Sequence, residues 1–512
     1  QTCTLGWPVE GCWPSQNDGT NITAVDCNLV NEHGNLIAAS GDNFGRLSLA
    51  RYPCRSAYSI KKQYRGHCGH ICKVRWAGGD SHLISVGATD KAVMVWRHEA
   101  DDMAVMDSSS GTTPDPVDDS DVEDDIPVLD GDVPSGAGGA GDGAGDNEEV
   151  KNTNLERPWI AGMVEPTNPP KPNPDLPDSE LELVYAHGFC SQTTRNSLAY
   201  NCMGELVYPT ASICVVYNKE THGQRFFRGH NCQVSACAVS PNGRFVASGV
   251  NSMRPQVRVW DAQTCAEIVC LREFHRVGIV SIAISPDCKR IVSVGADADR
   301  SIAVWYSLSG EWFDGKMQCN AKGTEKVMFA QFGGAEFDYM VVSGGMNHIK
   351  FWKVEGANMV SCRGIFGSVG KVQPMLCGAA VGSKFVTGTV SGHLYVWTGR
   401  KLEKIVRAHE KGINAIHSSS GGLVTGGKDG FIKIWSLALE HLRSYDLAEA
   451  QVPPLNLGVR SVYAGLDVTG TAITKVLVGT KGSEIYEIAM IKKKVCNELN
   501  CSYMHVHVCL LL

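Results

Sequence analysis

The chain has 512 residues, 43% of them hydrophobic, and carries 47 Lys or Arg against 54 Asp or Glu, for a net charge of −7. This length exceeds what one hydrophobic core supports and fits two or three domains. No run approaches the roughly 18 consecutive apolar residues of a membrane span, no signal peptide is visible, and the 20 cysteines lack the regular spacing of a disulfide framework, so we expect a cytoplasmic protein with reduced thiols rather than a membrane-spanning or disulfide-stapled one.

The charge is distributed unevenly along the chain. Residues 101–150 contain 16 Asp or Glu and no Lys or Arg, so the remainder carries 47 basic and 38 acidic residues. The predicted folded part is therefore basic. This favours an acidic partner such as a filament surface, a phosphorylated protein or nucleic acid, although ordinary solvation of the surface accounts for part of so modest an excess.

Residues 1–98 are predicted to form two β-rich units. Short runs of β-branched and aromatic residues, bounded by Gly, Ser and Asp, are typical of strands joined by tight turns. Two units alone would leave unpaired strand edges, so we interpret them as the end of an assembly that begins upstream, and the first residue, Gln1, also suggests a fragment. The strands of the first unit lie at 22–27, 35–41 and 46–52, and the second unit spans 64–96.

Residues 99–179 change character to acidic, Gly-rich and then Pro-rich sequence, as in DDSDVEDD, GAGGAGDGAGDNEE and NPPKPNPDLP. Such a segment has too little apolar surface to offset the entropy lost on ordering, and its Pro-rich end is typical of an extended spacer. We interpret it as a disordered linker between domains. An acidic docking site is the alternative.

From residue 180 to about 490 the strands return as seven units, the first beginning with ELELVYAHGF at 180–189. Tryptophans end five of the later units at intervals of 45, 47, 45 and 38 residues, which is near the 40–45 residues of a WD-repeat propeller blade. The chain is thus predicted to be all-β: a WD-repeat β-propeller of seven four-stranded blades, preceded by two blades of another, incomplete propeller. Residues 491–512 fit no blade. They are either the start of a new unit or an error at the end of the gene model from which the sequence was translated. The five tryptophans are Trp260, Trp305, Trp352, Trp397 and Trp435.

A His stands 26 to 30 residues before the Trp in four of the units. In the WD repeats that these units resemble, this His, a Ser or Thr on the second strand, an Asp six residues before the Trp and the Trp itself form a buried hydrogen-bonded network. Asp299 stands at the Asp position of a third unit, whereas Arg254, Met346 and Ser391 replace it elsewhere. The resemblance implies two complete networks: His67, Ser85, Asp90 and Trp96, and His409, Thr425, Asp429 and Trp435.

Two passages resemble the echinoderm microtubule-associated-protein-like family more closely than WD repeats in general. Residues 185–218 are similar to its HELP motif, with a Tyr-x-x-Gly start, Arg-Asn before a strand, Gly-Glu-x-Val-Tyr and a hydrophobic strand ending in Tyr-Asn. Residues 2–25 and the two units that follow resemble the closing blades of that family's tandem propeller. This order implies a member built from several tandem-propeller modules, of which this chain holds one junction.

Few residues are candidates for chemistry. The cluster His67, Cys68, His70 and Cys72 has a composition that suits zinc, but the repeat already explains His67, and His70 and Cys72 lead into a predicted strand at 71–76, whose side chains alternate between two faces, so we interpret it as structural. No Ser/His/Asp, Cys/His or paired-carboxylate arrangement stands apart from the blade pattern. We therefore expect no enzyme activity, metal or cofactor. Basic residues just before the repeat Trp, either a solvated face or partner contacts, are Arg258, Lys350 and Lys433. Lys428, in a surface loop beside Asp429, is a further candidate for partner contact.

The resemblance implies a non-enzymatic scaffold of the cytoplasm and cytoskeleton that binds tubulin or microtubules through propeller surfaces. Other proteins are expected as partners, whereas nucleic acid and membranes are not. The alternative function is a general WD-repeat adaptor for peptides or phosphorylated proteins without microtubule contact. An enzyme acting in the central channel has little support, because the channel-facing strands offer small apolar residues rather than convergent acids.

Overall fold

The structure, a computed structural model, describes residues 21–28, 36–52, 61–100, 176–177, 179–334, 337, 340–450, 453–467 and 469–490, and the backbone of 506–509. These residues form short antiparallel strands and two 3-10 turns, η2 (Gly78–Asp80) and η5 (Leu447–Glu449). The strands are grouped into four-stranded sheets in which each strand pairs with its neighbour in sequence. The predicted all-β propeller class is confirmed.

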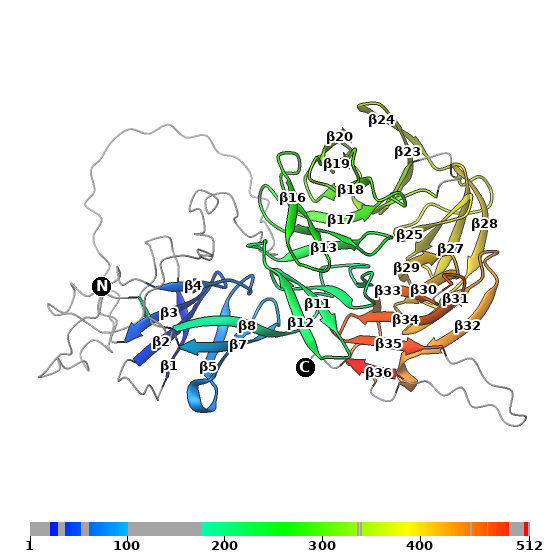
Figure 1. Cartoon of the computed structure of the whole chain (residues 1–512). Coiled ribbons are helices and arrows are strands. Elements are labelled where there is room, and N and C mark those ends of the chain that lie inside the picture. Colours follow the sequence, from blue (N-terminus) through cyan, green and yellow to red (C-terminus); the bar gives the residue numbers. More distant parts are fainter. Residues whose placement is uncertain are drawn as a thin grey trace, which may run out of the picture.

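Two sheets precede the ring and lie at one side of it (Figure 1). We call them the upstream blades. The first consists of β1 (Ile22–Cys27), β2 (Leu36–Asp42), β3 (Leu47–Tyr52) and β4 (Lys62–Tyr64), and the second of β5 (Ile71–Trp76), β6 (His82–Gly87), β7 (Val93–Ala100) and β8 (Ser179–His187).

Strand β8 corrects the sequence prediction. Residues 180–189 were expected to begin the first blade of the ring, but β8 pairs antiparallel with β7 from Ser179↔Ala100 to His187↔Val93. The outer edge of β7 would otherwise carry a row of unpaired N–H and C=O groups. Residues 101–178 separate β7 from β8 in the sequence, whereas paired strands are usually close neighbours in the chain. This pairing was therefore not predicted from the sequence. The predicted boundary at residue 180 therefore cuts through the second upstream blade.

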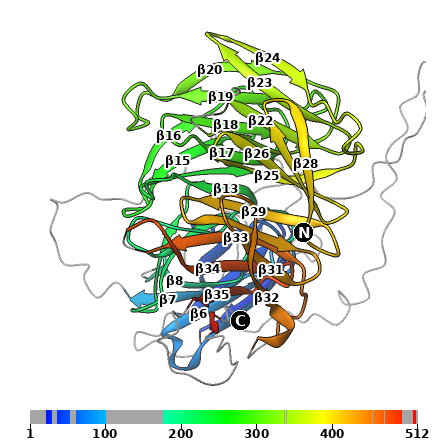
Figure 2. The same cartoon turned by 90° about the vertical axis from the view of Figure 1, so that its right-hand side faces the viewer.

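Seven sheets follow β8 and surround a common axis (Figures 1 and 2). The third and fourth touch at their outer edges through one parallel pairing, Asn320↔Asn358. The strands, blade by blade, are β9 (Ala199–Tyr200), β10 (Leu206–Thr210), β11 (Ile213–Asn218), β12 (Gly223–Phe227); β13 (Val234–Val239), β14 (Phe245–Val250), β15 (Val257–Asp261), β16 (Glu267–Leu271); β17 (Ile279–Ile284), β18 (Arg290–Gly295), β19 (Ile302–Tyr306), β20 (Lys316–Ala321); β21 (Val327–Phe332), β22 (Val341–Gly345), β23 (Ile349–Glu355), β24 (Asn358–Arg363); β25 (Met375–Val381), β26 (Lys384–Thr389), β27 (His393–Thr398), β28 (Lys401–Arg407); β29 (Ile413–Ser419), β30 (Gly422–Gly427), β31 (Phe431–Trp435), β32 (His441–Asp446); and β33 (Val459–Leu466), β34 (Ile473–Thr480), β35 (Ile485–Ala489), β36 (Val506–Cys509).

Strand β36 is a second correction, because residues 491–512 were predicted to fit no blade. Its backbone pairs antiparallel with β35 from Ile485↔Cys509 to Ile488↔Val506, so it is the outer strand of the seventh blade. β36 thus pairs with the strand that precedes it in the chain. The sequence between the two strands has no blade pattern from which this pairing could be predicted. Most of the predicted linker, residues 101–175, lies outside the described residues.

The hydrophobic core is divided among the gaps between neighbouring blades. Between the first and second blades of the ring, for example, Val216 and Phe227 pack on Val234 and Trp260. The rings of Phe227 and Trp260 stack with centroids 4.8 Å apart and an angle of 4° between their planes. Each blade therefore depends on both neighbours for burial of its apolar faces, as expected for repeats that cannot fold singly.

The segment between β8 and β9 fastens the first blade of the ring to the seventh. The Asn196 N–H donates to the Arg460 carbonyl at 3.2 Å. Nearby, Glu487 of β35 accepts from the Tyr200 hydroxyl at 2.5 Å and from Lys219 Nζ at 2.7 Å. These contacts join residues more than 260 positions apart, and they close the ring without a strand shared between the two blades.

The upstream blades pack directly on the first blade of the ring. Ser212 donates from its N–H and its hydroxyl to the Gly66 carbonyl, at 3.1 and 2.7 Å. The Arg228 guanidinium donates to the Arg65 carbonyl at 3.0 Å and lies 5.7 Å from the centre of the Trp96 ring. One core cluster contains residues of both parts, Trp96 and Ile213 among them.

Candidate interaction face of the ring

The sixth blade holds a complete buried network of the predicted type. The indole N–H of Trp435 donates to Thr425 Oγ1 at 3.0 Å, Thr425 Oγ1 lies 2.9 Å from His409 Nε2, and His409 Nδ1 lies 3.0 Å from Asp429 Oδ1. The hydroxyl of Thr425 can donate to Nε2 while Nδ1–H donates to the carboxylate, so every member of the chain has a partner. The carboxylate also accepts the N–H of Glu410 at 2.9 Å.

The second upstream blade repeats this arrangement. Trp96 Nε1 donates to Ser85 Oγ at 2.9 Å, His67 Nε2 lies 2.9 Å from the same oxygen, and His67 Nδ1 lies 3.0 Å from Asp90 Oδ2. Burial alone would raise the pKa of Asp90, but the hydrogen bond and charge of His67, with two backbone N–H donors, outweigh it and lower that pKa. The structure thus brings together all eight residues of the two predicted networks.

The third blade corrects one assignment. Asp299, at the expected position, is exposed and pairs with Lys322 at 3.0 Å. The buried carboxylate is Asp297, which accepts from Ser301, and Ser301 Oγ lies 2.6 Å from His275 Nδ1. Two extra residues in this turn shift the acid, so counting back from the Trp selects the wrong aspartate.

These buried residues are occupied by the fold and leave little for chemistry. Each of six tryptophans donates its indole N–H to a Ser or Thr on the second strand of its own blade. The residues of the possible zinc cluster do not converge, since the Cys72 thiol donates to the Val86 carbonyl instead. Within the described ranges, no group of three or more His, Cys, Asp or Glu side chains is arranged to hold a metal ion.

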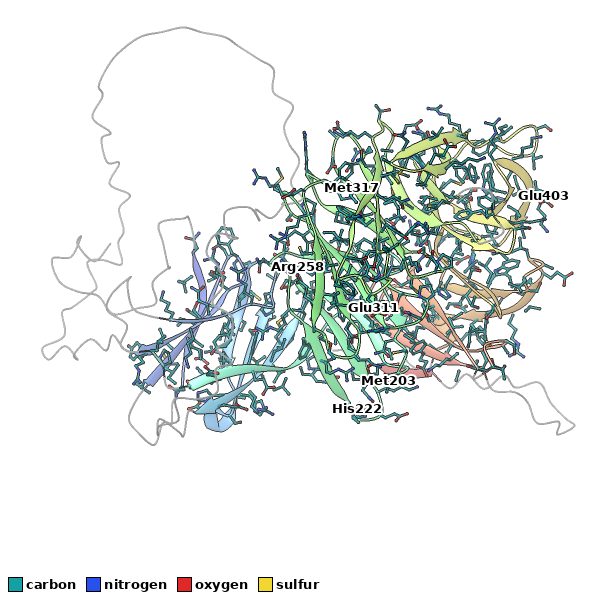
Figure 3. The ribbon with its side chains drawn as sticks, turned by 45° about the horizontal axis from the view of Figure 1, so that its top comes forward. Met203, His222, Arg258, Glu311, Met317 and Glu403 are labelled. Atoms are coloured by element: carbon teal, nitrogen blue, oxygen red, sulfur yellow. The ribbon has the colours of Figure 1, made fainter. Side chains whose placement is uncertain are left out.

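The four predicted partner-contact residues differ in their exposure and in their ion pairs. Arg258, on the side of the ring near the upstream blades (Figure 3), forms an ion pair with Glu267, with 2.5 Å between Nη1 and Oε2. Lys350 pairs with Glu325 at 3.0 Å. Lys433 is half-buried with its ammonium 6.0 Å from the centre of the Phe431 ring. Lys428 alone is exposed in a loop, and no ion pair of it is found among the described residues.

Lys428 lies on one face of the ring, which we call the entry face. It consists of the loops that lead into the first strand of each blade and the loops that join the second strand to the third. Antiparallel order brings both kinds of loop to the same edge of a sheet. Backbone bonds hold them together, as from Lys428 N to the Gly412 carbonyl at 2.8 Å and from Lys481 N to the Gly458 carbonyl at 2.7 Å.

The entry face carries an excess of exposed, unpaired cations. Exposed carboxylates there are fewer: Glu273, Glu410 and Glu449, with Asp299 already paired to Lys322. Sequence reasoning found only one of the cations, because whether a loop lysine has an acidic neighbour depends on other blades. The cations, drawn from five blades and without an ion pair in the described part of the chain, are Arg276, Lys326, Lys371, Lys411, Lys428 and Lys481.

The opposite face of the ring is balanced in charge. Arg244 pairs with Glu311 at 2.9 Å and Lys384 with Glu403 at 2.8 Å. Its four exposed cations that form no ion pair among the described residues, Lys289, Lys316, Arg400 and Lys401, are nearly matched in number by the three exposed carboxylates Glu220, Glu355 and Glu440, whereas the entry face has six such cations. The net positive charge of the ring therefore gathers on the entry face.

Comparison with known families accounts for this architecture. The model of the echinoderm microtubule-associated protein first β-propeller matches residues 223–488, which is more than half of the chain. The second β-propeller of the same proteins matches residues 1–98, and the HELP motif matches 176–215. The chain belongs to the echinoderm microtubule-associated protein family. Along this chain, the match to the second propeller comes before the match to the first propeller, which is the order expected from the sequence.

Relatives in this family are 26–28% identical to the chain over the regions that match. It is 28% identical to echinoderm microtubule-associated protein-like 2 of Rattus norvegicus over 327 residues, covering 60% of this chain and 49% of that protein. It is 28% identical to echinoderm microtubule-associated protein-like 1 of Homo sapiens, covering 61% and 40%, and 26% identical to the 77 kDa echinoderm microtubule-associated protein of Lytechinus variegatus, covering 60% and 48%. The chain thus spans less than half the length of these relatives.

The HELP motif is the element that joins the parts of this family member. Its residues 176–215 include β8, which completes the second upstream blade, and β9 and β10, which open the ring. The segment between β8 and β9 also contacts the seventh blade.

None of the helices in the described part is long and apolar enough to cross a membrane.

The Asp429→Asn substitution is expected to destabilise the ring at neutral pH by about 1–3 kcal/mol, since it weakens a buried hydrogen-bonded network. Burial tends to raise the pKa of Asp429, but His409 and the N–H groups of Glu410 and Phe431 lower it further than burial raises it. Because the folded pKa is depressed, this stabilisation is present above the unfolded pKa of about 4 and is lost as pH falls through the folded value. Urea unfolding from pH 7 to pH 3 measures the effect; curves of the two proteins should converge in acid, and a constant gap would contradict the assignment.

Proposed function

We propose that this chain is a non-enzymatic microtubule-associated scaffold that binds tubulin or microtubules through the entry face of its ring. The observation that carries the proposal is the group of unpaired cations on that face, from Arg276 to Lys481. Relatives in the family are named as microtubule-associated. The acidic surface of tubulin is the matching partner, and oppositely charged surfaces of this kind speed and orient association.

The proposal places the protein in the cytoplasm on the cytoskeleton. It assigns no catalysis, cofactor, nucleic acid or membrane partner, because the buried polar groups of the blades are used within the fold. The ring would present its rigid loops to the filament while the upstream blades, fixed to its side through Ser212 and Gly66, set the orientation of neighbouring segments.

Sedimentation of the full chain with polymerised tubulin tests this function. We expect sedimentation in low salt that weakens steeply between about 50 and 300 mM salt, since exposed charges more than a Debye length of about 8–10 Å apart are screened. Soluble tubulin added as competitor should reduce sedimentation if the contact is with tubulin itself. Failure to sediment at either salt concentration would remove the microtubule contact and leave the general adaptor function.

A further inference from the structure

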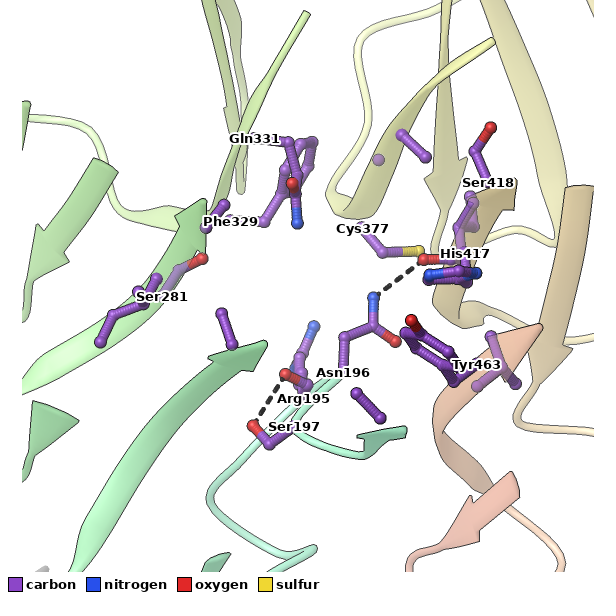
Figure 4. A pocket seen from close by; sticks show the side chains of 18 of the residues that line it. Arg195, Asn196, Ser197, Ser281, Phe329, Gln331, Cys377, His417, Ser418 and Tyr463 are labelled. Atoms are coloured by element: carbon purple, nitrogen blue, oxygen red, sulfur yellow. Dashed lines mark hydrogen bonds between the residues drawn. The ribbon is translucent and has the colours of Figure 1, made fainter. Parts of the chain in front are cut away.

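The axis of the ring is an open cavity of about 440 Å³, within the range of ligand sites. The first strands of the blades line it, together with the segment that precedes β9 (Figure 4). Its walls are mixed: Ile282, Phe329 and Leu376 are apolar, whereas Ser281 and Gln331 are polar. A ligand in this channel would meet a surface suited to a chain with both methylene and polar groups.

Arg195 reaches across the mouth of this channel. It stands in the HELP segment of the first blade, yet its Nη1 donates to the carbonyl of Leu376 in the fifth blade at 3.3 Å. Leu376 is the second residue of β25, so the guanidinium lies at the entry-face end. In the part of the chain that the structure describes, no carboxylate pairs with Arg195, and burial lowers its pKa.

A second guanidinium lies beside the first. Arg460 of β33 donates from Nε to the Ser191 carbonyl at 3.0 Å and from Nη2 to the Gln192 carbonyl. Burial, and then the positive charge of Arg195, lower the pKa of Arg460 to about 10. Two half-buried like charges that have only backbone carbonyls as partners are costly, and the low-dielectric walls of a channel concentrate their field on any anion.

Asn196 adds a polar group that the described residues do not satisfy. Its Nδ2 donates to the Ile416 carbonyl at 3.1 Å, which fixes the orientation of the amide and leaves Oδ1 buried without a partner in the described part of the chain. The residue adopts φ of +48°, a left-handed conformation that asparagine tolerates better than most residues other than glycine. A buried acceptor that finds no partner among the described residues points to a site that is completed by another molecule.

We propose that the mouth of the channel binds the carboxylate side chain of an acidic peptide, with Arg195 as its anchor. The planar guanidinium suits bidentate recognition of a carboxylate, the unpaired acceptor of Asn196 favours a ligand that also carries an N–H, and the cations of the entry face attract acidic chains. The site does not depend on the proposed microtubule contact, because its ligand is a short segment that enters the ring.

Fluorescence anisotropy of a labelled octapeptide of Glu and Gly, with the full chain, tests the site. We expect saturable binding that the matched Gln and Gly peptide lacks, and that Arg195→Gln weakens about tenfold or more, as for loss of charge-assisted hydrogen bonds. The control is Arg400→Gln, which removes the same charge from the opposite face of the ring and should change affinity less than about threefold. Arg195→Lys, which keeps the charge, should fall between the two and serves if the Gln variant does not fold.

Three results would overturn the inference. One is no binding of the Glu peptide; another is equal loss in the Arg195 and Arg400 variants, which would show that overall charge rather than the channel mouth governs binding. The third is displacement of the peptide by millimolar inorganic phosphate as effectively as by unlabelled peptide, which would indicate a general anion site. Because the peptide assay contains no tubulin, loss of peptide binding can be distinguished from failure of the chain to sediment with microtubules.

Discussion

Replacing Lys371, Lys411, Lys428 and Lys481 together with Glu is expected to reduce microtubule affinity by about 30-fold or more in low salt. Each exposed ion pair contributes roughly 0.2–1 kcal/mol, and reversal turns attraction into repulsion, so four reversals amount to about 2–4 kcal/mol. None of the four lysines forms an ion pair among the described residues, so the substitutions break no internal contact of that kind. Sedimentation over a series of tubulin concentrations gives the affinity.

A matched variant on the opposite face controls for net charge. Reversal of Lys289, Lys316, Arg400 and Lys401 changes the total charge by the same amount, and these side chains are also exposed and without ion pairs in the described part. We expect this variant to bind within about threefold of the parent chain at moderate salt, where distant charges are screened. Equal weakening by the two variants would show that overall charge, rather than the entry face, governs binding.

Replacement of Trp260 with Ala is expected to destabilise the ring by about 3–5 kcal/mol, the cost typical of removing a large aromatic side chain from a core. Trp260 is 0% exposed and stacks on Phe227 across the gap between the first and second blades. Its indole N–H donates to Ser248 Oγ at 3.1 Å, so the substitution also removes a buried donor. The midpoint of urea unfolding, followed by tryptophan fluorescence, measures the loss.

Phe313→Ala is the control for this prediction. Phe313 has similar size but is 70% exposed, so its removal should change stability by less than about 0.5 kcal/mol. A loss below about 1 kcal/mol for Trp260→Ala, or equal losses for the two variants, would mean that the apolar gap between these blades contributes far less than its burial implies.

The blades were predictable because each is a local structure repeated along the chain. A His, a Ser or Thr, an Asp and a Trp at nearly fixed spacing specify a network within one sheet, and the sixth blade has it as expected. Two features were not predictable in this way. β8 pairs with a strand on the far side of residues 101–178, and the acid of the third blade moved from Asp299 to Asp297 because its turn is longer.

The candidate site was harder to predict, because it depends on contacts between blades. Arg258 and Lys350 looked like surface cations, but folding brings Glu267 and Glu325 beside them. Lys428 remained exposed, and its companions on the entry face stand in loops with no common spacing. Arg195 was visible only as part of the Arg-Asn pair of the HELP resemblance; its place at the channel mouth follows from a contact with Leu376, 181 residues away.

Zero-length carbodiimide cross-linking to polymerised tubulin, read by mass spectrometry, tests the central claim most directly, because it joins lysines to carboxylates that are in contact. Both faces of the ring carry exposed lysines that can react. The account predicts cross-links from Lys326, Lys371, Lys411, Lys428 and Lys481. Cross-links confined to Lys289, Lys316 and Lys401 would contradict it.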